Sequence, residues 1–488
     1  MTVVVVVVAV VAVLALLALV HRWLWVRLVR DTTRAGGAAR RTGTVLAFAL
    51  PVLALAALTA GRAGAPFWLQ QVVAWPGYMW LAVLLYLTLA MLVAEPARRL
   101  WLRRLARTEA APASPGPGAP DTPGGPATTS DNCPNLAGAT AAGAAVSQPA
   151  GAGGAGTVQG ATAVGAQAPR PAGEHGAGTP QTAGAHGAGT PQTAGAGDPA
   201  TPEAAQSASA GGVCVGRRVF VARVAGGAAA AAALATVGTG TYGVLRGPRV
   251  KRVQVPLARL PRAAHGFRIA VVSDVHLGPV LGRAHTQRIV DTVNRTQPDL
   301  IAVVGDLVDG SVHDLGPAAE PLRLLRSRLG SYFVTGNHEY FSGARQWVDH
   351  VRELGLTPLE NARRELPHFD LAGVNDVQGE SEGQGPDFRA ALGDRDRSRT
   401  AVLLAHQPVV IHDAVRHGVD LQLSGHTHGG QLWPGNYLAE LANPTVAGLE
   451  RYGDTQLYVS RGAGAWGPPV RVGAPSDITV VELASYQA

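Results

Sequence analysis

A run of eighteen apolar residues near the start of the chain, Val3–Val20, constrains the architecture more than any other feature. It is long enough for a short transmembrane helix. Two further apolar runs follow, Thr44–Ala60 and Val72–Ala94, and the last carries aromatic residues suited to a membrane interface. A cleaved signal peptide is the alternative for the first run, but no basic region precedes it and no cleavage site follows it. We therefore predict three transmembrane helices within residues 1–107.

Charge is distributed unevenly around these runs. Six arginines lie between the first and second runs, only Arg62 lies between the second and third, and five arginines follow the third. The positive-inside rule then places the N-terminus outside the cytoplasm and the chain after Ala94 inside. Residues 1–249 hold 18 basic and 8 acidic residues, whereas residues 250–488 hold 23 and 26. The second half therefore lacks the basic excess of a nucleic-acid-binding protein, and no such partner is predicted.

Residues 108–215 are mostly Ala, Gly, Pro, Ser and Thr, and the sequence HGAGTPQTAGA occurs twice in tandem, from His175 and from His186. This segment cannot bury enough apolar surface to offset its ordering entropy, so we predict a disordered linker. Two histidines in so long a stretch are too sparse for a metal-binding tract. The two cysteines, Cys133 and Cys214, lie in this segment, which excludes a cysteine metal site or disulfide framework in the later region.

Residues 216–249 contain an Ala-rich apolar segment that opens with Arg217 and Arg218. It is consistent with a fourth transmembrane helix or with a twin-arginine-like signal anchor, and a soluble Ala-rich helix is a third interpretation. The first two carry the following chain across the membrane. We therefore predict a multi-pass protein of the cell membrane whose residues 250–488 lie outside the cytoplasm. The three N-terminal runs contain no charged residues, which argues against a transport function.

Residues 250–488 alternate short Val-, Ile- and Leu-rich runs with longer polar or amphipathic stretches, which is typical of an α/β domain. In five places an apolar run ends in polar residues of the types that can serve as metal ligands. The five stretches are FRIAVVSDVH, LIAVVGDLVD, SYFVTGNHE, AVLLAHQP and LQLSGHTHGG. We predict that each run is a buried strand and that each polar cluster lies at its carboxyl end, where open α/β sheets bind ligands.

These clusters supply seven candidate metal ligands with mixed oxygen and nitrogen donors. They are Asp274, His276, Asp306, Asn337, His406, His426 and His428. In an extended chain, Asp274 and His276 would point to the same side and could bind one cation. Such donors suit Mn, Fe, Co or Zn. Seven ligands exceed the needs of one open catalytic ion, so we predict a pair of divalent ions bridged by one carboxylate.

The five clusters resemble the motifs of the calcineurin-like metallophosphoesterases, which are D-x-H, G-D-x-x-D, G-N-H-D/E, a single His and G-H-x-H. The resemblance covers roughly residues 265–484, and the tail is similar to a membrane-tethered or exported bacterial branch of the YkuE and YaeI type. It implies a four-layer sandwich of two packed mixed β-sheets flanked by helices. It also implies hydrolysis of a phosphate ester by a hydroxide that bridges two metal ions.

The resemblance further implies a role for each matching position. One ion would be bound by Asp274, His276, Asp306 and His428, and the other by Asp306, Asn337, His406 and His426. His338 would act as the general acid rather than as a ligand. Asp309 is expected to accept a hydrogen bond, and Glu339 to support the ligands. Many relatives have an Arg after the second Asp of G-D-x-x-D, but this chain has Gly310 there, which removes a phosphate contact.

The expected substrate is a phosphodiester or a pyrophosphate. Some relatives act on lipid-linked or nucleotide-linked sugar phosphates, so lipid-, nucleotide-sugar- and cell-envelope-linked esters are the candidates. The alternative function is that of a binding or scaffold protein on an inactive phosphoesterase fold at the membrane. That alternative predicts lost ligands, and all seven are present.

Overall fold

The computed structural model describes residues 2–110 and 216–486, so the predicted linker lies outside the described residues apart from its first three positions. Four helices in the described residues are long and apolar enough to cross a membrane. They are α1 (Thr2–Trp25), which continues as the π-helical turn η1 (Val26–Arg30), α2 (Ala38–Thr59), α3 (Phe67–Ala110) and α4 (Arg217–Leu245). Helix α3 continues well beyond Ala94, where the third apolar run ends.

Helix α3 packs against both α2 and α4. Gly77 allows the α2–α3 approach, because a Cβ atom there would overlap the Leu53 carbonyl oxygen and the Ala57 side chain. Near the basic end of α3, the buried Glu95 carboxylate accepts hydrogen bonds from Arg27, Arg98 and Arg99. Large apolar side chains on the outer surfaces of these helices are exposed, as expected of helices that contact lipid.

Residues 249–485 form two six-stranded mixed sheets. The first has the order β1-β12-β2-β3-β4-β5, and the second has the order β10-β11-β9-β8-β7-β6. The first contains β1 (Arg249–Leu257), β12 (Asp477–Ser485), β2 (Phe267–Val272), β3 (Leu300–Val304), β4 (Ser331–Val334) and β5 (Thr357–Pro358). The second contains β10 (Gly448–Tyr452), β11 (Thr455–Val459), β9 (Leu421–Ser424), β8 (Ala401–Leu404), β7 (Asp370–Gly373) and β6 (Ala362–Glu365). Strands β2–β5 are parallel neighbours, as are β7, β8, β9 and β11.

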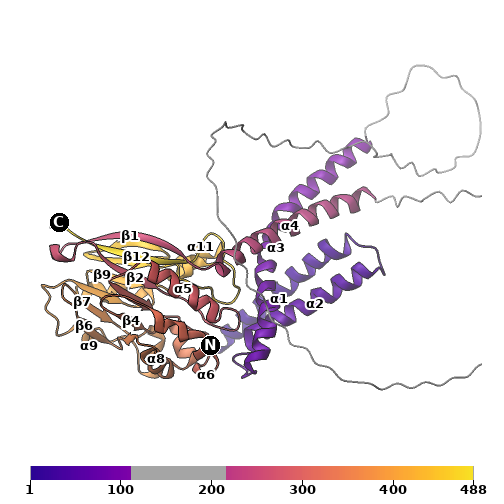
Figure 1. Ribbon diagram of the computed structural model, residues 1–488. Helices are drawn as coiled ribbons and strands as arrows, with labels where there is room; N and C mark the ends of the chain where they lie inside the picture. Colours follow the sequence, from indigo (N-terminus) through magenta and orange to yellow (C-terminus); the bar gives the residue numbers. More distant parts are fainter. Residues whose placement is uncertain (1, 111–215, 487–488) are drawn as a thin grey trace, which may run out of the picture. The chain divides into compact units, whose positions relative to one another are not determined.

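The two sheets pack face to face through buried apolar side chains from both, including Ile269, Val304, Leu404 and Tyr458. The outer face of the first sheet is covered by α5 (Arg283–Arg295), α6 (Val312–Ala319) and α8 (Ala344–Glu353) (Figure 1). Helices α9 (Phe388–Leu392) and α10 (Ile411–Arg416) pack on the outer face of the second sheet. The result is the predicted four-layer α/β sandwich. Two further helices, α7 (Asn337–Ser342) and α11 (Gly435–Ala442), follow β4 and β9.

Candidate metal centre

The carboxyl ends of five strands meet at one place, and every predicted site residue lies there. Asp274 and His276 follow β2, Asp306 follows β3, and Asn337 and His338 begin α7 after β4. From the second sheet, His406 follows β8, and His426 and His428 follow β9. Three groups of these side chains are close enough to hold metal ions, each with ligand atoms within 4.8 Å of one another. The groups are Asp274–His276–His428, His276–Asp306–His338 and Asp306–His406–His426.

The backbone turns sharply at most of these positions. Asp274, His276, Asp306, His426 and His428 all have positive φ angles, between 49° and 73°. The expectation that Asp274 and His276 share a side of an extended chain is therefore wrong, because both are in the left-handed region. Each such conformation costs a non-glycine residue about 1–2 kcal/mol. Strain of this kind persists where the surrounding structure enforces it, which is common at functional sites.

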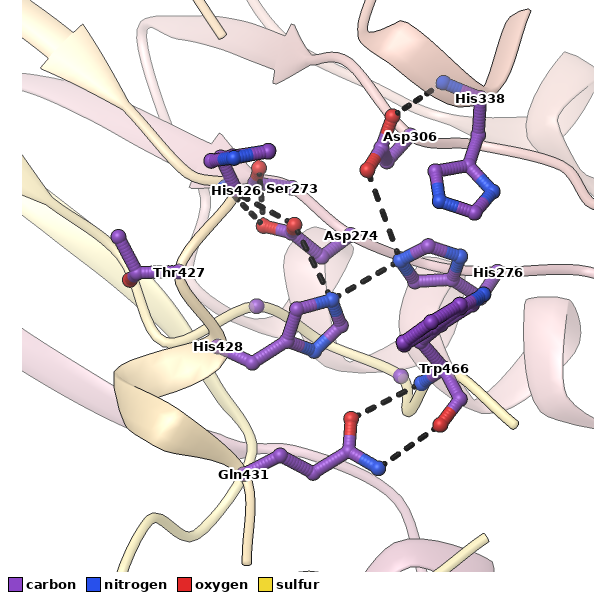
Figure 2. A network of polar contacts seen from close by, with 12 residues as sticks. Ser273, Asp274, His276, Asp306, His338, His426, Thr427, His428, Gln431 and Trp466 are labelled. Carbon is purple, nitrogen blue, oxygen red and sulfur yellow. Dashed lines mark hydrogen bonds and ion pairs between the residues drawn. The ribbon is translucent and has the colours of Figure 1, made fainter. Parts of the chain in front are cut away.

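The first group joins the ends of β2 and β9. His276 Nε2 lies 2.9 Å from His428 Nε2, and His428 Nε2 lies 3.4 Å from Asp274 Oδ1 (Figure 2). The Asp274 carboxylate is fixed by hydrogen bonds from Ser273 Oγ and from the His426 backbone N–H. Two imidazole nitrogens that face each other beside a carboxylate form a compact set of atoms that one cation could bind.

The group Asp306–His406–His426, with Asn337 beside it, joins the ends of β3, β4, β8 and β9. His406 Nε2 lies 3.1 Å from Asp306 Oδ2, and His426 Nδ1 lies 3.0 Å from Asn337 Oδ1. His406 Nδ1 donates to the Val304 carbonyl oxygen at 2.9 Å, which directs Nε2 into the site. This buried Nε2 has no well-aligned hydrogen-bond partner among the described residues. An unpaired, buried imidazole nitrogen beside a carboxylate fits a metal ligand.

Asp309 contacts the imidazoles of both His276 and His338. Its Oδ1 lies 3.0 Å from His276 Nδ1 and 2.6 Å from His338 Nδ1. Burial raises the pKa of the Asp309 carboxyl, but the two imidazoles outweigh burial and lower it to about 2. Asp309 is thus an ionised acceptor that orients both rings, as expected from its place in the G-D-x-x-D motif.

Glu339 holds together the loops that carry the ligands. Its buried carboxylate accepts hydrogen bonds from the backbone N–H groups of Asp306 (3.0 Å), Leu307 (2.7 Å) and Gly336 (2.6 Å). It therefore fixes the end of β3 against the start of α7. Since its oxygens are occupied by backbone donors, Glu339 supports the site rather than facing its centre.

Comparison with known proteins identifies the family. Residues 267–430 match the family model of the calcineurin-like phosphoesterases. The chain is 34% identical over 240 residues to a metallophosphoesterase of Aquifex aeolicus, covering 48% of this chain and 91% of that one. The chain belongs to the calcineurin-like metallophosphoesterase family.

Among other relatives of this metallophosphoesterase, one is named for a membrane region beside the same domain, and another matches this chain over almost its whole length. This chain is 40% identical over 250 residues to the "Transmembrane protein with metallophosphoesterase domain" of Danio rerio, covering 48% of this chain and 57% of the relative. It is 29% identical over 283 residues to YkuE of Bacillus subtilis, covering 55% and 98%. A dimetal phosphatase structure from Danio rerio aligns with 14% identity and a TM-score of 0.31, over 45% of this chain and 93% of that one.

The electrostatics of this metallophosphoesterase also fit cations. Burial lowers the pKa of His276, but Asp309, Asp306 and Asp274 outweigh it and raise the pKa to about 9. The same balance raises the pKa of His406 well above its ordinary value. The carboxylates thus favour positive charge at these two imidazoles, and bound divalent ions would supply that charge in place of protons. The donor set of carboxylate, amide and imidazole groups therefore fits a pair of divalent ions.

Arg471 is a site residue that the sequence did not reveal. Its buried guanidinium donates to the His428 carbonyl oxygen at 2.9 Å and lies 2.9 Å from His428 Nδ1. Burial and the Arg471 charge both lower the pKa of His428 well below its ordinary value, which keeps the imidazole neutral. Trp466 was also missed, and its ring lies 5.8 Å from that of His338. Both follow the G-H-x-H motif by more than thirty residues, and no local pattern marks either.

Proposed function

We propose that this chain is a membrane-anchored phosphoesterase that uses two divalent metal ions to hydrolyse a phosphodiester or a pyrophosphate. One observation carries the proposal: ligands from both sheets converge in three neighbouring groups, two of which contain Asp306. The chain spans 57% of the length of the transmembrane relatives that it matches, so activity, substrate and partners are inferred from the site itself.

We assign one ion to Asp274, His276, Asp306 and His428, and the other to Asp306, Asn337, His406 and His426, with Mn, Fe, Zn and Co as candidates. The distances within the groups support this division. Asp306 Oδ2 lies between the two sides, 3.7 Å from His276 Nε2 and 3.1 Å from His406 Nε2. When bound, the two ions would neutralise phosphate charge and lower the pKa of water enough to give a nucleophile near neutral pH.

His338 is assigned as the general acid for the leaving oxygen. Its Nδ1 is engaged by Asp309 at 2.6 Å, which leaves Nε2 to act on the substrate. The ring borders a cavity of about 460 Å³ beside Phe341 and Trp466, so a leaving group there is within its reach. Asp309 fixes the orientation of the imidazole through this contact, as a carboxylate does for a general acid–base histidine.

We further propose four membrane-spanning helices, with the catalytic domain (250–488) outside the cytoplasm and the segment 108–215 as a linker. The arginines support this orientation. They gather at the α1–α2 connection, at the carboxyl end of α3 and at the start of α4, whereas the α2–α3 turn (residues 60–66) holds only Arg62. Helix α4 leads directly into β1, which places the domain beyond the carboxyl end of α4.

The test is a hydrolysis assay on the full chain purified in detergent, with bis(p-nitrophenyl) phosphate and p-nitrophenyl phosphate as substrates. Each is assayed with Mn, Zn or Fe and with chelator. We expect metal-dependent turnover that Asp306→Asn abolishes and that Asp291→Asn, an exposed change on α5, leaves intact. A folded chain that binds metals but hydrolyses neither ester would contradict the proposal and favour a scaffold function.

A further inference from the structure

The cavity beside the metal centre has walls from two different parts of the chain. One wall is formed by His276, Asp309, His338 and Trp466 of the α/β domain. The opposite wall is formed by the end of α2, the α2–α3 turn and the first part of α3, from Ala57 to Tyr78. Any substrate that reaches His338 through this cavity must therefore contact the apolar helices as well as the domain.

Three independent contacts hold the helices against this side of the domain. Phe67, at the start of α3, packs on the core beneath the first sheet. The Tyr86 hydroxyl of α3 donates to the Trp433 carbonyl oxygen at 2.9 Å. Val470 is buried among side chains of α3 and α4, and a Cβ atom at Gly240 of α4 would collide with it. The residue after Val470 is Arg471, which donates a hydrogen bond to the proposed metal ligand His428. Helix α4 therefore packs next to a residue that holds a metal ligand in place.

The helices also supply the positive charge of the cavity. Among the described residues that line it, Arg62 is the only arginine or lysine, and the α/β domain contributes the carboxylates Asp309 and Asp314. A phosphate ester that enters this cavity carries negative charge. Gly310 stands where a further guanidinium would have been expected. Arg62 is therefore the one cationic side chain placed to meet that charge.

The surface next to the site is apolar and unusually exposed. Helix α11 begins a few residues after the G-H-x-H motif, and Leu438 and Leu441 on it are 72% and 85% exposed. Trp433 and Tyr437 are half exposed beside them. The Trp433 carbonyl oxygen accepts a hydrogen bond from Tyr86 of α3, so this patch is continuous with the helices proposed to span the membrane. Aromatic and leucine side chains in such a position suit the interface of a bilayer.

We propose that the substrate is a phosphate ester carried by a membrane-embedded amphiphile, and that Arg62 of the α2–α3 turn binds its phosphate group. The proposal rests on the proposed phosphoesterase function. The apolar chain stays among lipids beside α2, α3 and α11, while the phosphate reaches the metal centre through the shared cavity. Phe341 and Trp466, both exposed at the cavity, then contact the part of the amphiphile next to the scissile bond.

The first experiment compares two substrates with the same scissile bond, p-nitrophenyl ethyl phosphate and p-nitrophenyl hexadecyl phosphate. The full chain is assayed in phosphatidylcholine vesicles with its preferred metal. We expect kcat/KM for the hexadecyl ester to exceed that for the ethyl ester by at least about tenfold, since each buried methylene favours the membrane-bound ester. Equal values would overturn the amphiphile proposal. Loss of both activities, or turnover that Asp306→Asn retains, would overturn the phosphoesterase function instead.

The second experiment tests Arg62 by Arg62→Gln, with Arg62→Lys as the conservative variant. Arg34→Gln, an exposed arginine near the other end of α2, is the matched control. We expect Arg62→Gln to lower kcat/KM for the hexadecyl ester by about tenfold or more, mainly through KM, because a charge-assisted contact to phosphate is lost. Arg62→Lys should recover part of the loss, and Arg34→Gln should match the wild type. Wild-type kinetics in Arg62→Gln would overturn the assignment.

A third experiment tests the shared cavity without any activity. Cysteines replace Ala65 in the α2–α3 turn and Ser342 in the domain, which line the same cavity, with Cys133 and Cys214 changed to serine. A short bismaleimide should join the pair in vesicles. It should not join Ala65→Cys to Ser381→Cys, an exposed position outside the cavity. The absence of a cross-link in the first pair would contradict the inferred cavity.

Discussion

At the scale of single residues, Asp309 is the first position to test because it contacts both His276, the proposed metal ligand, and His338, the proposed general acid. Asp309→Asn keeps the shape but removes the charge that orients His276 and His338. We expect a fall of about 10- to 100-fold in activity together with weaker metal binding, as for other residues that orient metal ligands. Steady-state kinetics and metal analysis of the purified variant check this.

The variant His338→Ala distinguishes general-acid catalysis from metal binding at this position. It should retain both ions and lose turnover by about 10²–10⁴-fold, the usual contribution of a general acid. Depleted metal in His338→Ala would instead make His338 a ligand, as its closeness to His276 and Asp306 allows.

Glu339 is predicted to affect stability more than chemistry. Glu339→Gln turns an NH₂ group toward backbone donors, so at least one of the three hydrogen bonds to Asp306, Leu307 and Gly336 is lost. We expect a loss of about 1–3 kcal/mol in unfolding free energy. Thermal unfolding measured by circular dichroism tests this against Glu382→Gln, an exposed glutamate that should change nothing. Equal melting temperatures for the two variants would refute the supporting role.

At the scale of elements, the close fit between the loops after β2 and β9 leads to a further prediction. A Cβ atom at Gly425 would overlap Ser273 Oγ and Asp274 Oδ2. Gly425→Ala should therefore displace the Asp274 carboxylate, cost about 1–3 kcal/mol through overpacking, and reduce bound metal. Gly282→Ala is the control, because an added Cβ meets nothing there. Full metal content in Gly425→Ala would show that the loop adjusts.

The strands and the ligands at their ends could be predicted because both signals are local. An apolar run followed within a few residues by Asp, Asn or His indicates a strand end, and β2, β3, β4, β8 and β9 all follow that pattern. The positive φ angles of Asp274 and His276 could not be predicted, since tertiary contacts impose them. Arg471 and Tyr86 were missed because their partners, His428 and Trp433, lie far away in the sequence.

At the scale of the whole molecule, bound metal should contribute to folding stability. The proposed ions bind the folded chain, in which ligands from both sheets are assembled, so their removal lowers stability by mass action. At a free metal concentration of 100 times Kd the effect is about 2.7 kcal/mol. Chelator should lower the melting temperature, and added metal should restore it. Asp306→Asn should show little response, and an equally large shift in that variant would point to metal bound elsewhere.

The proposed membrane orientation can be tested by labelling single cysteines in intact cells, with Cys133 and Cys214 changed to serine. Ser381→Cys is exposed on the α/β domain, and Arg34→Cys lies in the connection between α1 and α2. A membrane-impermeant maleimide should label the first from outside and reach the second only after lysis. The reverse pattern would place the catalytic domain in the cytoplasm.

The division of ligands between the two sheets has a practical consequence. The first sheet carries Asp274, His276, Asp306 and Asn337, and the second carries His406, His426 and His428, which lie later in the sequence. A chain divided at the exposed Gly383 would leave each fragment with an incomplete set for both ions. Hydrolysis by a mixture of the two fragments would then report their reassociation, so the proposed activity would make this protein a candidate for a split-protein sensor whose signal is catalytic.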